Sequence, residues 1–219
     1  MIWLITGGTH GIGKALCELV AEHGHEVVTC SREDYDVSDP MMAEALVHKT
    51  AHEYGQIDVL VNNASIYERA TVEHTSIDFW NKCIGTNLNG TFYMCKFVVP
   101  HMKQQQSGKI INVSSYVANF SPVERAAYNC SKLAVLGLTE TLAKEVVDDN
   151  IKVNAFSPLK TATRMDVDET AVCSPEEAAR QIYDLYEWQV GHRHCTGKFF
   201  VGREEAKRLV SFPIIKGKK

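Results

Sequence analysis

The chain has 219 residues, 45% of them hydrophobic and 23% charged, which supports a folded core and argues against disorder, collagen or a coiled coil. Its 23 basic and 27 acidic residues give a formal charge of −4, so no bulk positive field is present to hold nucleic acid or an anionic membrane. We expect one domain over residues 1–219, with residues 214–219 fraying at its end.

Short apolar segments alternate along the chain with longer segments of helical period. The short ones are rich in Val, Ile, Leu or Phe and are predicted to be strands buried on both faces. They are Ile2–Ile5, Glu26–Cys30, Asp58–Val61, Lys109–Val113, Lys152–Phe156 and Lys198–Val201. The predicted helices are one from Ile12 to Gly24, then Met41–Tyr54, Ile77–Gln105 with interruptions near Gly85 and Gly90, Ala126–Asp148, and Pro175–Glu187. This alternation predicts an α/β fold with a doubly wound parallel sheet, whose ligands bind beyond the carboxyl ends of the strands.

A glycine-rich turn, Thr6-Gly7-Gly8-Thr9-His10-Gly11-Ile12-Gly13, joins the first predicted strand to the first predicted helix. Glycines let the backbone approach a pyrophosphate closely, and the positive end of the following helix attracts its charge. We interpret the turn as a dinucleotide-binding site. The cofactor contacts that it predicts are Gly7, Thr9, His10, Gly11, Ile12 and Gly13. A glycine-rich turn that binds no ligand is the alternative.

Ser31 and Arg32, at the end of the second predicted strand, bear on which dinucleotide binds. An acid at this position accepts hydrogen bonds from the adenosine ribose hydroxyls of NAD. A guanidinium instead pairs with the 2′-phosphate of NADP, so we predict that Ser31 and Arg32 favour NADP over NAD. Glu33 and Asp34 follow directly and count against this preference.

Three polar residues in the second half of the chain are candidates for acid/base chemistry. Ser115 precedes Tyr128 by thirteen residues, and Lys132 follows Tyr128 by four, a spacing that places both side chains on one helix face. An ammonium beside a phenol favours the phenolate and lowers the tyrosine pKa from its ordinary value of about 10. Ser115, directly beyond a predicted strand, is in place to hold a substrate oxygen. The alternative for Tyr128 and Lys132 is a solvent-facing helix pair.

In this order and spacing, these motifs make the chain resemble the short-chain dehydrogenase/reductase family, from Ile2 to about Gly202. The cofactor turn matches Thr-Gly-x-x-x-Gly-x-Gly, Asn62–Ala64 matches Asn-Asn-Ala, and Tyr128–Lys132 matches Tyr-x-x-x-Lys. The resemblance implies a single-domain, Rossmann-like enzyme. It would transfer a hydride between NADP(H), with NAD(H) as the alternative, and a small carbonyl or alcohol substrate.

The resemblance also implies roles for the site residues. Tyr128 is the general acid/base, while Lys132 binds the nicotinamide ribose and lowers the tyrosine pKa. Ser115 steadies the reacting oxygen, and Asn87 orders a water in the proton path. Asn63–Ala64 borders the adenine ribose.

The chain departs from the family pattern in two places. Asp36–Val37 follows Arg32 almost directly, where the family has an intervening strand and helix, so we expect a shortened third strand and helix region. Asp36 and Val37 are then adenine contacts, or Asp36 is a turn residue before the next helix. Pro158–Leu159 stands in place of the family's Pro-Gly and stiffens the loop beside the nicotinamide, where Thr161 is assigned to the carboxamide.

The candidate residues for contact with the substrate belong to no specific motif. Candidate apolar walls are Tyr67, Val117, Phe120 and Phe156, and candidate contacts for an anionic substrate are Lys160 and Arg164. The resemblance further implies a homodimer or homotetramer that pairs the helices Leu88–Gln105 and Ala126–Asp148.

Two other functions compete with the oxidoreductase. A non-catalytic regulator that senses a nicotinamide dinucleotide would keep the glycine turn, but it has no need for Asn87, Ser115, Tyr128 and Lys132 together. A sugar-nucleotide epimerase or dehydratase usually has a longer substrate-binding half than this chain has room for.

The cysteines indicate a reducing compartment, because all seven are scattered and none are spaced Cys-x-x-Cys. His192 and His194 bracket Arg193 and have no acidic residue directly beside them, so we expect no metal site. The apolar opening Met1–Ile5 ends at Thr6, too early for a signal peptide or a membrane span. These patterns predict a cytoplasmic protein that contacts no membrane.

Overall fold

The computed structural model describes residues 1–119, 121–161, 173–191 and 196–202. Six strands form one parallel sheet in the order β2-β1-β3-β4-β5-β6. Their bounds are β1 Ile2–Thr6, β2 Glu26–Cys30, β3 Val59–Asn62, β4 Gly108–Val113, β5 Ile151–Ser157 and β6 Phe199–Val201. All six predicted strands are confirmed.

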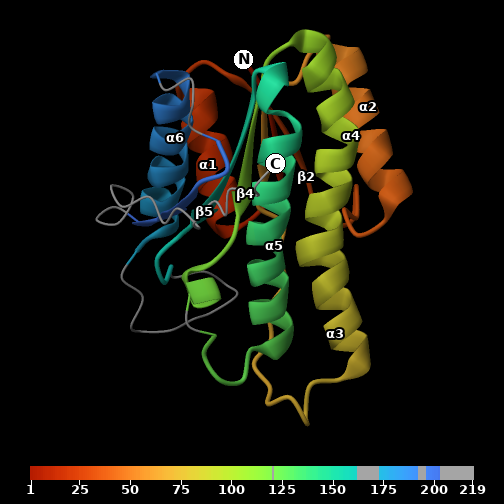
Figure 1. Ribbon diagram of the computed structural model, residues 1–219, viewed down its shortest axis with the longest axis vertical. Helices are drawn as coiled ribbons and strands as arrows, with labels where there is room; N and C mark the ends of the chain where they lie inside the picture. The colour runs from red at the N-terminus through yellow and green to blue at the C-terminus, as the bar shows by residue number, and fades with distance from the viewer. Residues whose placement is uncertain (120, 162–172, 192–195, 203–219) are drawn as a thin grey trace, which may run out of the picture.

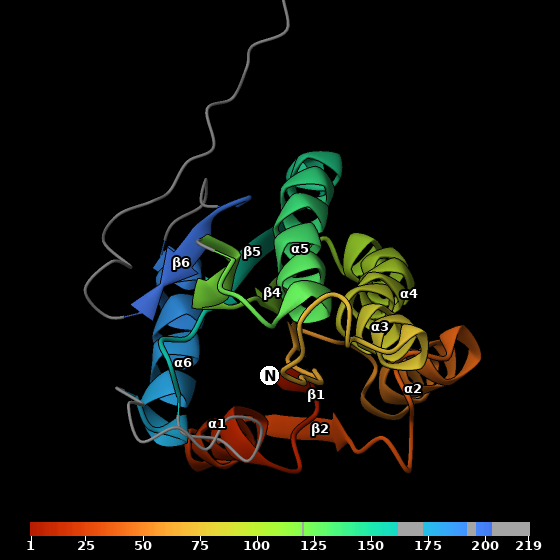
Figure 2. The same cartoon turned by 90° about the horizontal axis from the view of Figure 1, so that it is seen from below.

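Helices cover both faces of this sheet (Figures 1 and 2). On one face lie α1 (Gly11–Glu22) and α6 (Pro175–Gly191), which contact each other. On the other lie α2 (Pro40–Tyr54), α4 (Gly90–Gln105) and α5 (Ala126–Glu145), with α3 (Ile77–Ile84) leading into α4. The predicted doubly wound, Rossmann-like α/β fold is therefore confirmed. The crossover helices leave β1 and β3 on opposite sides, and a crevice forms there at the carboxyl ends.

Two hydrophobic cores follow from the alternation of side chains along the central strands. On β1, Trp3 and Ile5 point to the face covered by α1 and α6, whereas Leu4 points to the face covered by α2 and α4. Leu16 of α1 and Met94 of α4 are among the fully buried partners on the two faces. Both cores hold the strand ends, and hence the crevice, in fixed positions.

Local contacts fix the ends of the helices. Gly24 adopts φ 75° just beyond α1, and the Asp39 side chain accepts a hydrogen bond from Met41 N at the start of α2. At the start of α6, Ser174 N donates to Glu177 Oε2 and Glu177 N donates to Ser174 Oγ. This reciprocal pair is a capping box.

The predicted shortening of the third strand and helix region is confirmed, because the chain passes from β2 directly to α2.

One expectation about strand burial is wrong. We predicted every strand to be buried on both faces, but β2 lies at the edge of the sheet, with Glu26 and Thr29 exposed and Val27 and Val28 only partly buried. The strand that would cover this edge in the family is missing here.

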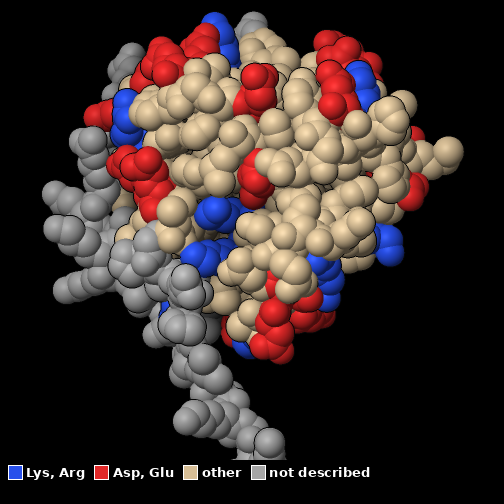
Figure 3. Space-filling view, turned by 90° about the horizontal axis from the view of Figure 1, so that it is seen from above, with Lys and Arg blue, Asp and Glu red and all other residues tan. Residues whose placement is uncertain are grey.

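Several predictions fall on residues outside the described part of the chain: Phe120, Arg164, His192, His194 and the tail at 214–219. Within the described part, no helix is both long and apolar enough to cross a membrane, and no three His, Cys, Asp or Glu residues gather as a metal site would require. On the face at the amino ends of the strands, acidic and basic side chains are interspersed (Figure 3).

Candidate active site

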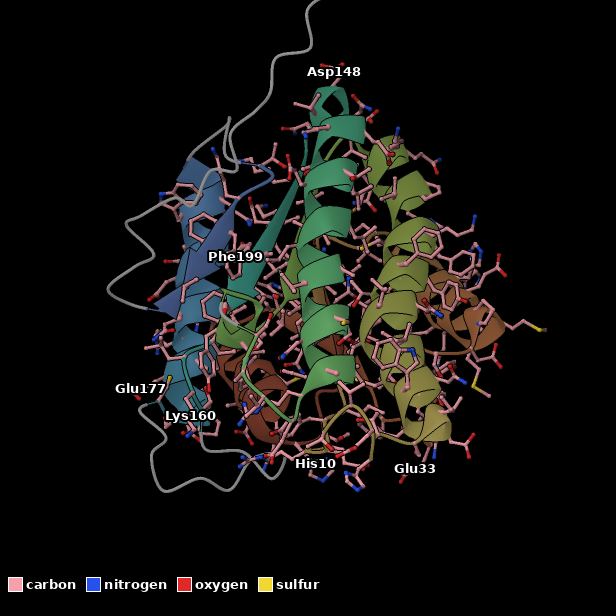
Figure 4. All side chains as sticks on the ribbon, turned by 60° about the horizontal axis from the view of Figure 1, so that its bottom comes forward. His10, Glu33, Asp148, Lys160, Glu177 and Phe199 are labelled. Atoms are coloured by element: carbon pink, nitrogen blue, oxygen red, sulfur yellow. The ribbon has the colours of Figure 1, made fainter. Side chains whose placement is uncertain are left out.

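A cavity of about 530 Å³ opens at the carboxyl ends of the strands. It is lined by the glycine turn after β1, the segments that follow β2, β3, β4 and β5, and the first turns of α5. Figure 4 shows His10 and Lys160 at this end of the molecule and Asp148 at the opposite end. The volume suits a ligand larger than a single small metabolite.

The glycine turn has the conformation that a pyrophosphate site needs. Gly7 and Gly11 have φ values of 66° and 52°, in the left-handed region that favours glycine. His10 precedes α1 without a side-chain capping bond, and the first turn of α1 has no acidic residue. The N–H groups at the start of α1 are therefore not capped by a side chain and carry the positive end of the helix dipole.

Thr6 and Asn63 tie the glycine turn to the end of β3. Thr6 Oγ1 accepts hydrogen bonds from Asn63 N at 3.1 Å and from Ala64 N at 3.0 Å. Asn63 Nδ2 in turn donates to the carbonyl oxygens of Thr6 and Gly7, at 3.1 Å each. The Asn-Asn-Ala segment thus holds the glycine turn in shape from the neighbouring strand.

Gly13 does not line the cavity, but it lets α1 approach the turn. A Cβ there would collide with Gly7 O and come within 2.5 Å of Asn63 Nδ2.

We expect Gly13→Ala to lower the free energy of unfolding by about 1–3 kcal/mol, as overpacking does, and to weaken dinucleotide binding. Urea denaturation and cofactor fluorescence measure the two effects. Gly85→Ala, where the added Cβ would meet only Ser38 Cβ at an ordinary 3.6 Å, is the matched control outside the cavity and should leave both unchanged or raise stability slightly. Equal behaviour of the two variants would contradict the assignment.

The segment after β2 forms the end of the cavity where we predict that adenosine binds. Arg32 Nε donates to Asp36 Oδ2 at 3.0 Å, and Ser38 donates from both N and Oγ to Asp36 Oδ1. Burial pulls the pKa of Asp36 upward, but the Ser38 hydrogen bonds and the Arg32 charge outweigh it and lower this pKa. Asp36 therefore acts as a turn residue before α2, and it also lines the cavity, while its contact with adenine stays a prediction.

The three predicted catalytic side chains come together at the other end of the cavity. Ser115 follows β4, while Tyr128 and Lys132 stand one turn apart on α5. Lys132 Nζ lies 5.7 Å from the centroid of the Tyr128 ring and donates to Val113 O at 2.8 Å. Lys132 is only 2% exposed, which excludes the solvent-facing pair that we kept as an alternative.

The ionisation of this group differs from what the motif alone suggests. Burial raises the pKa of Tyr128 to about 12, although Ser115, Ser65 and Arg125 all act to lower it. Burial lowers the pKa of Lys132 to about 8. The expected drop in the tyrosine pKa is thus not found in this structure, because removal of the phenol from water outweighs its polar neighbours.

Asn87 lies behind the cavity wall rather than on it. It belongs to a π-helical turn, Gly85–Asn89, between α3 and α4, where the sequence predicted an interruption. Its Oδ1 accepts from Ile66 N at 2.8 Å, and its Nδ2 donates to Ile66 O and to Ser131 Oγ, both at 3.0 Å. The amide therefore holds the loop after β3 against α5. The water-ordering role stays a prediction.

The remaining cofactor assignments fall on the cavity wall. Pro158, Leu159 and Thr161 line it after β5, and Thr161 Oγ1 donates to Leu159 O at 2.7 Å. Every predicted cofactor residue except Gly13 lines the cavity, as do all the predicted catalytic residues except Asn87. Of the expected apolar walls, Tyr67 and Val117 contribute, whereas Phe156 is buried in the core beside α6 instead.

Sequence reasoning missed several residues of the cavity wall, among them Tyr35, Ser65, Thr86 and Arg125. Ser65 directly follows the Asn-Asn-Ala motif, and Arg125 stands three residues before Tyr128, so closeness to a motif was the signal available. The Ser65 hydroxyl faces Tyr128 closely enough to lower its pKa.

Comparison with known proteins agrees with this geometry. The family profile described as short chain dehydrogenase matches residues 34–172, which is more than half of the chain. The 3-oxoacyl-[acyl-carrier-protein] reductase FabG of Thermotoga maritima is 37% identical over 178 residues, covering 72% of each chain. The chain belongs to the short-chain dehydrogenase/reductase family. As a member of this family it is an enzyme, an oxidoreductase.

Other relatives in the short-chain dehydrogenase/reductase family extend the match. The FabG of Escherichia coli is 33% identical over 175 residues, covering 72% of each chain. The ligand-free aldohexose dehydrogenase of Thermoplasma acidophilum superposes with a TM-score of 0.85 at 26% identity, covering 99% of this chain and 97% of the other. A 3-ketoacyl-(acyl-carrier-protein) reductase from Brucella melitensis, solved with NADH, has the same fold at 24% identity and a TM-score of 0.85 over 91% and 95% of the two chains.

Proposed function

We propose that the chain is a single-domain reductase or dehydrogenase that exchanges a hydride between NADP(H) and a small carbonyl or alcohol substrate. The observation that carries the proposal is one continuous cavity that joins the glycine turn, Arg32 and the group Ser115, Tyr128 and Lys132. The backbone turn at Gly7 and Gly11 fits a pyrophosphate. Arg32, at one end of the cavity, fits a ribose phosphate, and Lys132, at the other end, fits a ribose hydroxyl. When bound, the nicotinamide supplies or accepts the hydride.

In the direction of carbonyl reduction, each residue has one task. Ser115 holds the substrate oxygen with its hydroxyl and fixes the carbonyl beside Tyr128. Tyr128 donates the phenolic proton to that oxygen as negative charge develops on it. Lys132 stabilises the phenolate that remains, since its ammonium lies on the same helix face. In alcohol oxidation the same groups act in reverse.

The rival function is a regulator that binds the dinucleotide without turnover. The group Ser115, Tyr128 and Lys132 argues against it, because a protein that only senses the dinucleotide has no need for a hydroxyl and a phenol beside a buried ammonium on one cavity wall. We infer that the enzyme also self-associates as a homodimer or homotetramer through α4 and α5, on which Phe92 and Leu133 are exposed. We further propose the cytoplasm as its location.

The preference for NADP over NAD is a prediction that rests on Arg32. Its Nε binds Asp36, and its terminal nitrogens have no hydrogen bond to any described residue, so the guanidinium edge is available to a 2′-phosphate. We expect NADPH to bind about ten- to a hundredfold more tightly than NADH, and Arg32→Gln to remove most of that difference. Fluorescence titration with both cofactors measures it.

Arg180→Gln, an exposed position on α6, is the matched loss of one positive charge and should leave the preference intact. Tighter binding of NADH by the unmodified chain would show that the preference is assigned wrongly. The function itself is tested by the loss of reduced-nicotinamide absorbance with a panel of aldehydes and ketones, and binding without turnover across the panel would favour the regulator.

A further inference from the structure

The loop after β3 is held on both sides of Ser65, a residue that lines the cavity. Before it, Ala64 N donates to Thr6 Oγ1 at 3.0 Å. After it, Ile66 is bound through its backbone, because Ile66 N donates to Asn87 Oδ1 at 2.8 Å and Ile66 O accepts from Asn87 Nδ2 at 3.0 Å. Ser65 therefore has a fixed position on the cavity wall, although it belongs to a loop.

The Asn87 amide also holds this loop against the helix that carries the phenol. Asn87 Nδ2 donates to Ser131 Oγ at 3.0 Å, and Ser131 Oγ donates to Tyr128 O at 2.8 Å. Two residues beyond Ser65, the Tyr67 ring stands edge-on to the Tyr128 ring, with the two centroids 5.2 Å apart. Hydrogen bonds and ring packing thus set the separation between Ser65 and Tyr128.

The Ser65 hydroxyl is a polar group that the fold itself does not use. Its oxygen is buried, and within the described part of the chain it has no hydrogen-bond partner of ordinary geometry. A buried hydroxyl in this state lowers stability, so folding gives no reason to keep it. The hydroxyl nevertheless lies near enough to the Tyr128 phenol to lower the pKa of that group. It is a donor placed beside the phenol and not fully used while the phenol holds its proton.

The phenol needs such a donor because its surroundings oppose the charged form. Burial raises the pKa of Tyr128 to about 12. The neighbours that act on this pKa are Ser115, Ser65 and Arg125, which lower it, and Cys83 of α3, which raises it. Lys132 lies on the same helix as the phenol, with its Nζ 5.7 Å from the ring centroid. In the proposed reaction Ser115 binds the substrate oxygen, so of the two hydroxyls Ser65 is the one left for the phenolate.

We propose that Ser65 is a positioning residue for the acid/base step, whose hydroxyl donates a hydrogen bond to the Tyr128 oxygen as the phenolate forms. This inference rests on the proposed function and deepens it. In carbonyl reduction the phenolic O–H bond breaks, its proton goes to the substrate oxygen, and the electron pair stays on the phenolate, while Ser65 keeps its own proton. The hydrogen bond is therefore stronger in the transition state than before it, which is the condition for raising kcat.

Ser65→Ala tests this role. With NADPH and a carbonyl compound that the unmodified enzyme reduces, we expect kcat to fall about ten- to a hundredfold, as the loss of a hydrogen bond to a charged group does. KM, and the affinity for NADPH measured by fluorescence, should change less than about twofold, because the lost bond forms only as the proton leaves. The midpoint of urea denaturation should stay the same or rise, since the substitution removes a buried hydroxyl without a partner.

Ser157→Ala is the matched control. Ser157 ends β5, and its buried hydroxyl oxygen also has no hydrogen-bond partner among the described residues, but it does not line the cavity. This variant should leave kcat, KM and NADPH affinity unchanged. An unchanged kcat in Ser65→Ala, an equal fall in Ser157→Ala, or a fall explained by weaker binding or a lower denaturation midpoint would overturn the role of Ser65 and leave the oxidoreductase standing. If the unmodified chain reduces no compound of the panel, the proposed function fails, and the role of Ser65 fails with it.

Discussion

Replacing Tyr128 with phenylalanine is expected to lower turnover by about 10²- to 10⁴-fold, the range that a positioned general acid contributes. The variant loses the phenolic hydroxyl, which lines the cavity together with Ser115 and Lys132. Phenylalanine keeps the ring, and hence the edge-on contact with Tyr67. NADPH should therefore bind to the variant almost as it binds to the unmodified enzyme.

Two measurements distinguish a catalytic from a structural effect of this substitution. Single-turnover absorbance reports the chemical step, and fluorescence titration reports cofactor affinity. Tyr54→Phe, at the end of α2 and outside the cavity, is the matched loss of a phenolic hydroxyl and should leave both unchanged. Wild-type turnover in Tyr128→Phe would reject the acid/base role, as would a loss of turnover explained fully by lost cofactor binding.

Local patterns in the sequence predicted most of the fold and most of the residues that line the cavity. The strand segments are short, apolar and bounded by polar residues, and the glycine turn stands between a strand and a helix, so each feature is specified within a few residues. The helix interruption at Gly85 and the capping box at Ser174 are likewise specified within a few residues. Where a short segment determines its own conformation, the sequence of that segment is sufficient to predict the conformation.

The unpredicted features depend on contacts between distant segments. Arg125 lines the cavity from a loop that forms a β-bridge with Ala70, and neither segment's own sequence indicates that pairing. Asn87 turned out to bind the Ile66 backbone because the π-helical turn directs its side chain away from the cavity. The edge position of β2 follows from a missing neighbour, which the strand's own apolar pattern does not reveal.

The ionisation of the active site is also a property of packing rather than of motif. The four-residue spacing places Tyr128 and Lys132 on one face, but spacing says nothing of how far water is excluded from them. In the folded chain burial dominates both groups, raising one pKa and lowering the other, since each side chain favours its uncharged form in an apolar setting. The neutral phenol is the form needed to donate a proton to a carbonyl.

Lys132→Met is expected to abolish most of the activity and, at the same time, to stabilise the protein. Methionine matches the length of the lysine stem but carries no charge, so the variant no longer removes an ammonium from water at a position that is 2% exposed. A pKa lowered from 10.5 to about 8 corresponds to roughly 3 kcal/mol of unfavourable burial, of which the lost hydrogen bond to Val113 O offsets a part. We expect the free energy of unfolding to rise by about 1–3 kcal/mol at pH 7 and turnover to fall by at least about a hundredfold.

The pH dependence of this gain follows from the direction of the pKa shift. Below about pH 8 the lysine is charged in both the folded and the unfolded chain, so the full burial penalty is present in the unmodified enzyme. Between pH 8 and the ordinary lysine pKa near 10.5, the folded chain has released this proton while the unfolded chain still holds it, and the unmodified enzyme gains stability as pH rises. The advantage of Lys132→Met should therefore shrink across that interval. Urea denaturation at several pH values measures it, with Lys14→Met, an exposed lysine of α1 paired with Glu18, as a control that should change stability by less than about 0.5 kcal/mol. A destabilised Lys132→Met, or a gain that does not vary with pH, would show that burial does not penalise the Lys132 ammonium and does not lower its pKa.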